Sequence, residues 1–119
     1  MTSPLFTPFT CKSLRLANRF AMAPMTRTRS PSGVPTEDVV AYYRRRAAHG
    51  VGLIITEGTT VEHPVATYHP DVPRFWGDES LRVWKEVVDA VHAEGGRIVP
   101  QLWHVGSARR PGTPPFPEE

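Results

Sequence analysis

The chain has 119 residues, a net charge of +2, and a composition that is 39% apolar and 22% charged. This balance is typical of a globular protein, and no apolar run approaches the roughly 18 residues of a membrane span. The positive charge is too weak and too scattered for a nucleic-acid-binding face. We therefore expect neither a membrane protein nor a nucleic-acid-binding protein.

The side chains that bind metals or form disulfides are few or badly spaced. A single cysteine, Cys11, excludes an internal disulfide framework, so we expect a cytoplasmic protein. The five histidines lack the spacing of a zinc site, and we expect no metal.

The first half of the chain predicts a hairpin, a strand and a helix. Residues 5–16 alternate weakly between apolar and polar side chains, which favours a short hairpin. Residues 20–23 are an apolar run stopped by Pro24, and we predict the first strand there. Thr36 precedes a helical pattern with acidic residues in its first turn, and this helix is expected to end at residues 49–50.

The next elements are a strand, a long loop and a second helix. Residues 51–55 are a continuous apolar run, as expected of a parallel strand buried on both faces. Residues 62–76 predict a long loop. Asp78 is predicted to cap a helix whose buried face carries four apolar residues: Leu81, Trp84, Val88 and Val91.

The last part of the chain predicts a third strand and a tail. Residues 97–103 have the apolar character of a strand, although Pro100 argues against a regular one because it removes a ladder donor. Residues 107–119 are rich in proline and predict a loop or linker.

Polar residues gather where the predicted strands end, in segments 23–26, 56–59 and 101–104. Parallel α/β folds build their sites at this edge. The Thr26 hydroxyl can donate a hydrogen bond to a carbonyl-like oxygen. The Gln101 amide donates and accepts, which suits the edge of a flavin or a base; the alternative is a buried glutamine satisfied within the core.

Four other residues near these strand ends have two interpretations each. Gly58 either lets a flat ligand approach the backbone or serves a turn. Glu57 is either a general base or, as we favour, the partner of an arginine. Trp103 and Tyr68 are either packing residues or the wall of a substrate site.

Read together, these segments resemble the amino-terminal third of the old yellow enzyme family, the FMN-dependent NADH:flavin oxidoreductases and ene-reductases. The resemblance is carried, in order, by residues 5–8, 16–20, 23–27, 42–47, 53–59, 84–85, 91–92 and 101–106. It implies an α/β fold, a partial TIM (β/α)8 barrel in which a short amino-terminal hairpin precedes the first three βα units. Residues 1–119 are then expected to be the amino-terminal portion of one FMN-binding barrel domain.

The resemblance also implies the site. The residues expected to bind FMN are Ala23, Pro24, Met25, Thr26, Gly58 and Gln101. The Thr26 hydroxyl would lie near the flavin C4 carbonyl, and Thr26, Tyr68 and Trp103 would lie on the substrate side. The family's proton donor, substrate-binding donors and phosphate-binding residues lie beyond residue 119, so no catalytic residue is expected in this chain. Ser107 and Thr67 depart from the common pattern of the family.

The implied activity is the reduction of activated alkenes (α,β-unsaturated carbonyls) or quinone-like acceptors, with NADH or NADPH as hydride donor. It would belong to a longer chain, acting on a small molecule and free to form a homo-oligomer. The alternative is a non-catalytic truncated fragment that needs a partner to fold. A third interpretation, an unrelated α/β binding module with a basic face, predicts salt-sensitive nucleic-acid binding.

Overall fold

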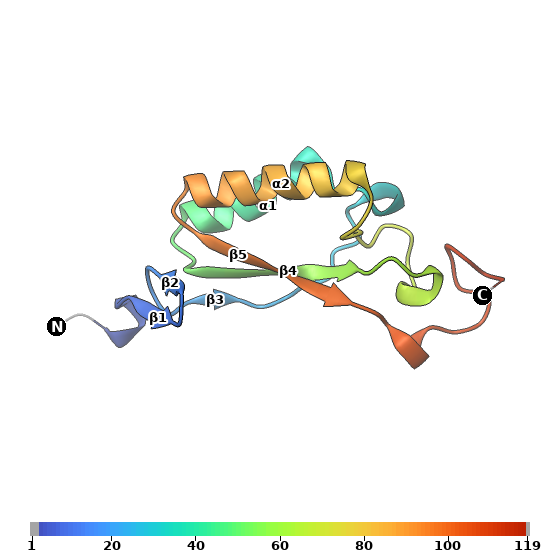
Figure 1. Cartoon of the computed structure of the whole chain (residues 1–119), viewed down its shortest axis with the longest axis horizontal. Coiled ribbons are helices and arrows are strands. Elements are labelled where there is room, and N and C mark those ends of the chain that lie inside the picture. The colour runs from blue at the N-terminus through green and yellow to red at the C-terminus, as the bar shows by residue number, and fades with distance from the viewer. Residues whose placement is uncertain (1–2, 119) are drawn as a thin grey trace.

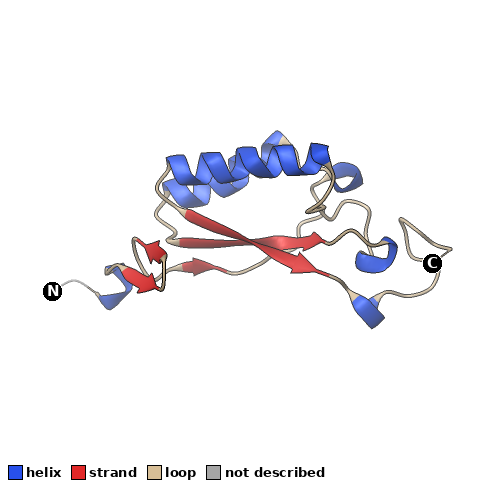
Figure 2. Ribbon diagram, viewed as in Figure 1, coloured by secondary structure: helices blue, strands red, loops and turns tan. Residues whose placement is uncertain are grey.

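The computed structural model describes residues 3–118, which form an elongated molecule of 59 × 27 × 23 Å. A small hairpin lies near the amino terminus, and two α-helices lie together on one face of a three-stranded sheet (Figure 1). Figure 2 shows the loops gathered at the other end of the sheet, where the strands end. Residues 1, 2 and 119 lie outside the described part, so the predicted tail is followed only to residue 118.

The hairpin predicted within residues 5–16 is confirmed. Strands β1 (Phe9–Cys11) and β2 (Leu14–Leu16) pair antiparallel, with Thr10 opposite Arg15. The two-residue connection contains Lys12 at φ +52°, a left-handed conformation of the kind that tight turns require. A short 3-10 turn, Pro4–Phe6, precedes the hairpin.

The larger sheet has the predicted β-α-β-α-β order. Its strands are β3 (Ala21–Met22), β4 (Leu53–Thr60) and β5 (Arg97–Trp103), arranged β3-β4-β5 and all parallel. Helices α1 (Glu37–Ala48) and α2 (Asp78–Ala93) connect them. Within residues 3–118 no α-helix follows β5, only a 3-10 turn at Gly106–Ala108, so the third βα unit is represented by its strand.

The predicted end of the second strand at residue 55 is wrong, because β4 continues to Thr60. An irregularity separates the pairing of Ile55 from that of Gly58, after which Gly58 pairs with Gln101. Threonine hydroxyls bridge the interruption. The Gln101 N–H donates to Thr56 Oγ1 (3.1 Å), and Thr59 Oγ1 donates to the Gln101 carbonyl (2.8 Å). Segment 56–59 therefore lies inside a strand and is held rigidly to its neighbour.

The core lies between the two helices and the sheet. Its buried residues are Val39, Tyr43, Ala47, Ile54, Trp84, Val87 and Val91. Trp84 and Val91 of the predicted face of α2 are buried. The face is nevertheless rotated, because Val87 is fully buried and Leu81 is 43% exposed. The predicted cap of α2 is also wrong, since Gly77 precedes the helix and Asp78 is its first residue.

The face of the sheet opposite the helices is uncovered (Figures 1 and 2). Ile98 packs against the helical core, so the alternation of side chains along β5 places Val99 and Gln101 on the open face. Val99 is accordingly 39% exposed. Parallel sheets are normally covered on both faces, so this open face is the most unusual feature of the fold.

Candidate functional site

The predicted site segments meet at one end of the sheet. Segments 23–26, 56–59 and 101–104 lie toward the carboxyl ends of β3, β4 and β5, respectively. Because these strands are adjacent and parallel, their carboxyl ends lie at the same edge of the sheet (Figure 1). In α/β folds this is the edge where ligands bind. The topology therefore brings the predicted cofactor residues to neighbouring positions.

Gln101 lies on the open face with its side chain exposed. Its backbone N–H and carbonyl are both bonded to threonines of β4, whereas within residues 3–118 its side-chain amide has no hydrogen-bond partner. The alternative interpretation, a buried glutamine satisfied within the core, is therefore wrong. The reason is the uncovered face, since within residues 3–118 no second layer packs over β5 there.

Segment 23–26 is also accessible. Ala23, Met25 and Thr26 are exposed and Pro24 is half-buried. In the described part of the chain the Thr26 hydroxyl has no hydrogen-bond partner, so its donor and acceptor capacity is available to a ligand.

Gly58, Trp103 and Tyr68 are brought together. A Cβ atom on Gly58 would lie 2.0 Å from Cε3 of Trp103, so the indole occupies the space that any side chain at position 58 would need. The Trp103 and Tyr68 rings meet edge to face, with centroids 5.6 Å apart and planes at 87°. Both aromatic residues therefore flank the end of β4. The approach of Gly58 to a flavin stays a prediction, because Trp103 alone accounts for the glycine.

Glu57 is the partner of an arginine, as we favoured. Arg27 Nη2 donates to Glu57 Oε2 at 2.6 Å and Nε donates at 3.2 Å. The Tyr43 hydroxyl donates to the same oxygen (3.2 Å) and accepts from the Glu57 N–H (2.8 Å). Burial raises the pKa of Tyr43 well above its ordinary value, and the neighbouring Glu57 carboxylate raises it further. Glu57 is 1% exposed, so this group is buried and fixed rather than presented to a substrate.

Arg27 is the functional-site residue that the sequence interpretation missed. The signal was the expectation that Glu57 pairs with an arginine, but the chain has twelve arginines and pattern alone does not distinguish them. Only the fold shows that the loop after β3 carries Arg27 back over the middle of β4.

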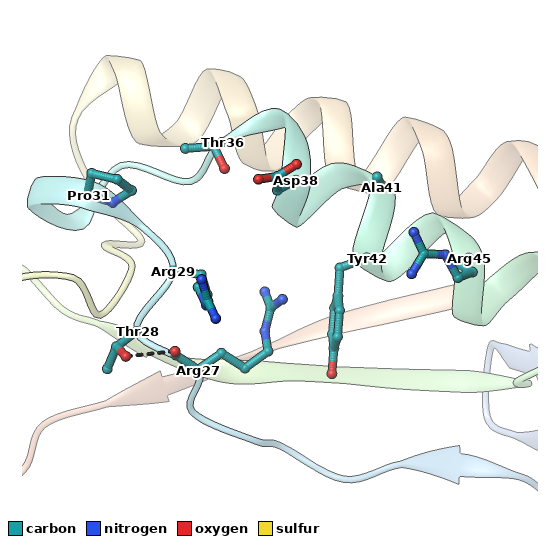
Figure 3. Close-up of a pocket in the computed structure, with 9 residues that line it drawn as sticks. All are labelled: Arg27, Thr28, Arg29, Pro31, Thr36, Asp38, Ala41, Tyr42 and Arg45. Carbon is teal, nitrogen blue, oxygen red and sulfur yellow. Dashed lines mark hydrogen bonds between the residues drawn. The ribbon is translucent and has the colours of Figure 1, made fainter.

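A cavity of about 570 Å³ lies beside Arg27, between the loop after β3 and α1 (Figure 3). Figure 3 shows Arg27, Arg29 and Tyr42 facing into it. None of the predicted cofactor residues lines this cavity. It therefore adjoins the candidate site but is separate from it.

The site residues fit a flat, polar-edged molecule and show no metal centre. Thr26 and Gln101 offer unpaired donors and acceptors beside the exposed apolar surface of Met25 and Val99. Such a pairing of apolar surface with polar groups is what a flavin ring requires. Residues 3–118 contain no group of three or more potential metal ligands, and no helix in that range is long and apolar enough to cross a membrane.

Comparison with known proteins identifies the family. The NADH:flavin oxidoreductase / NADH oxidase family profile matches residues 4–114. The chain is 47% identical to 12-oxophytodienoate reductase 7 of Oryza sativa subsp. japonica over 106 residues, which are 89% of this chain and 26% of that protein. It is 46% identical to a chanoclavine-I aldehyde reductase of Penicillium roqueforti, covering 92% of this chain and 29% of that one.

Solved structures agree. Morphinone reductase in complex with tetrahydroNAD superposes with a TM-score of 0.83 at 47% identity, over 91% of this chain and 29% of that one. The old yellow enzyme homologue from Zymomonas mobilis gives 0.82 at 38% identity, over 92% and 30%. The chain thus spans less than a third of the relatives it matches, and its fold corresponds to part of their TIM barrels. It belongs to the NADH:flavin oxidoreductase / NADH oxidase family, whose members use FMN with NAD(P)H as hydride donor.

Proposed function

We propose that the native protein containing these residues is an FMN-dependent ene-reductase that oxidises NAD(P)H and reduces activated alkenes or quinone-like acceptors. The observation that supports this most is the set of accessible, unpaired polar groups of Thr26 and Gln101 at the ends of neighbouring strands. The names of the relatives point the same way, since 12-oxophytodienoate, chanoclavine-I aldehyde and morphinone are all named as carbonyl compounds.

In this proposal the chain's own residues hold and orient FMN. Residues 23–26 and Gly58 lie against the ring, the Thr26 hydroxyl donates to it, and the Gln101 amide donates and accepts at its polar edge. When bound, FMN supplies hydride transfer, and hydrogen bonds to its ring tune that chemistry. Tyr68 and Trp103 form an aromatic wall on the substrate side, where they exclude water from the reacting atoms.

Replacing the two polar residues tests the proposal. In the native protein, Thr26→Ala and Gln101→Ala should each weaken FMN binding about fivefold or shift the flavin's reduction potential, because each removes a hydrogen bond worth about 1 kcal/mol. Thr10→Ala, an exposed threonine in β1, and Leu102→Ala, beside Gln101, are the matched controls. Wild-type affinity and potential in both test variants would contradict the assignment of these residues.

A second candidate is a non-catalytic fragment that needs a partner to complete its fold. The uncovered sheet face favours it, because Val99 is exposed where a parallel sheet is normally buried. This candidate predicts that the native protein carries no flavin and oxidises NAD(P)H no faster than buffer does. The ene-reductase proposal predicts that the native protein carries FMN and oxidises NAD(P)H faster than buffer does.

A further inference from the structure

The segment after β3 is held almost without backbone hydrogen bonds. Outside the regular strands and helices, no backbone–backbone hydrogen bond joins residues 23–29 to another residue in the range 3–118. The first such bond after β3 is donated by the Ser30 N–H to the Asp71 carbonyl (3.1 Å). Unbonded loops of this kind open locally at low free energy unless side chains fix them.

The side chain of Arg27 supplies that attachment. Its guanidinium donates twice to Oε2 of Glu57, at 2.6 and 3.2 Å, and lies 3.6 Å from the centre of the Tyr42 ring. Arg27 is 18% exposed and Glu57 is 0% exposed at the side chain. A charge-assisted, two-donor contact that is largely removed from water is much stronger than a surface ion pair.

The acceptor is itself rigid. Glu57 lies inside β4. The hydroxyl of Tyr43, a residue of α1, donates to Oε2 of Glu57 and accepts from the backbone N–H of Glu57. The attachment therefore joins the loop after β3 to the central strand and to the first helix at one point. Removing one partner of a buried ion pair leaves the other charge uncompensated, which is strongly unfavourable.

The backbone next to Arg27 is strained. Thr28 has φ +54°, a left-handed conformation that β-branched residues rarely adopt, and its hydroxyl donates to the Arg27 carbonyl (2.7 Å). Such a conformation persists only where the surroundings impose it. The contact that can impose it here is the one made by the preceding side chain.

We propose that Arg27 is a positioning residue: through Glu57 and Tyr42 it fixes residues 23–29, and with them the surface that Met25 and Thr26 present at the ends of the strands. The consequence for the cofactor rests on the proposed function, in which this surface lies against FMN. The attachment of the segment does not rest on it. In this proposal Arg27 acts through the segment that it holds and not by touching the flavin.

The test compares Arg27→Ala with Arg29→Ala in the native protein. Arg29 is an exposed arginine of the same loop without a partner in residues 3–118, so it controls for loss of charge. Two readouts are used: the NMR backbone order parameters of residues 25–29 and the reduction potential of the bound flavin. Arg27→Ala should lower the order parameters of 25–29 from about 0.85, typical of a rigid backbone, to below about 0.6, and should shift the potential. Arg29→Ala should change neither, and Arg27→Lys should restore part of the order.

Glu57→Gln keeps the inference testable if Arg27→Ala does not fold. It retains the shape of the side chain but removes the charge, so the order parameters of residues 25–29 should fall in this variant too. Unchanged order parameters in the folded variants would overturn the proposal. So would an equal fall throughout α1, α2 and β5, because that would mean a general loosening of the fold. Wild-type protein without flavin would contradict the proposed function alone, since the order parameters still decide the role of Arg27.

Discussion

At the scale of single residues, the group formed by Arg27, Tyr43 and Glu57 shows how burial turns ordinary side chains into fixed ones. Three hydrogen bonds, two from Arg27 and one from Tyr43, converge on Oε2 of Glu57, while its Oε1 is buried with no partner within residues 3–118. The Tyr43 hydroxyl completes the group by accepting from the Glu57 backbone. Tyr43 must therefore stay protonated for the group to persist.

This requirement predicts a pH dependence of stability. Because the pKa of Tyr43 is raised in the folded chain, that chain keeps its proton at pH values where the unfolded chain loses it. The contribution is fully present below about pH 10 and is lost as the pH rises above that value. The free energy of unfolding should then fall by up to about 1.4 kcal/mol per pH unit more steeply than in Tyr43→Phe. Urea unfolding between pH 9 and about 11.5 measures this, and equal slopes would contradict it.

Residue roles were predicted well from the sequence where chemistry alone decides them, and poorly where a neighbour decides them. An arginine partner for Glu57 was expected, but its identity required the path of the loop. A buried Gln101 was left open as an alternative because an isolated strand pattern does not say whether a second layer covers it. Gly58 was interpreted from its own flexibility, whereas the Trp103 ring is what excludes a side chain there.

At the scale of elements, the sequence predicted each strand and helix of the larger sheet, but not all boundaries. The end of β4 was missed because Thr56 and Thr59 read as polar loop residues, yet their hydroxyls bond to the backbone of β5. The buried face of α2 was misplaced by including Leu81. Leu81 faces solvent, whereas its neighbours Ser80 and Val83 are buried.

The corrected face of α2 predicts unequal effects of two similar truncations. Val87→Ala should lower the free energy of unfolding by about 2 kcal/mol, because it leaves a cavity among the fully buried residues of the core. Leu81→Ala removes a larger side chain but one that is 43% exposed, so its cost should be below about 1 kcal/mol. Chemical denaturation followed by circular dichroism compares them. A larger effect at Leu81 would restore the face predicted from the sequence.

At the scale of the whole molecule, the fold corresponds to part of the TIM barrels of its structural relatives. Its radius of gyration is 16.0 Å, whereas a compact domain of this length has about 13.5 Å. The helices cover one face of the sheet and leave the other face open (Figure 1), and the candidate site lies where the strands end. The related structures are TIM barrels in which the matched part is about 29% of the chain. Closure of such a barrel would cover the open face that the isolated residues leave exposed.

The flavin content of the native protein decides between the FMN-dependent ene-reductase and the non-catalytic fragment. The protein that carries this sequence is purified from its source under non-denaturing conditions, and bound flavin is released by acid and identified by mass. We expect FMN, close to one molecule per chain. Addition of NADH or NADPH should reduce it, and an α,β-unsaturated carbonyl compound should reoxidise it. Purified protein with no flavin, or with FMN that neither nucleotide reduces, would contradict it.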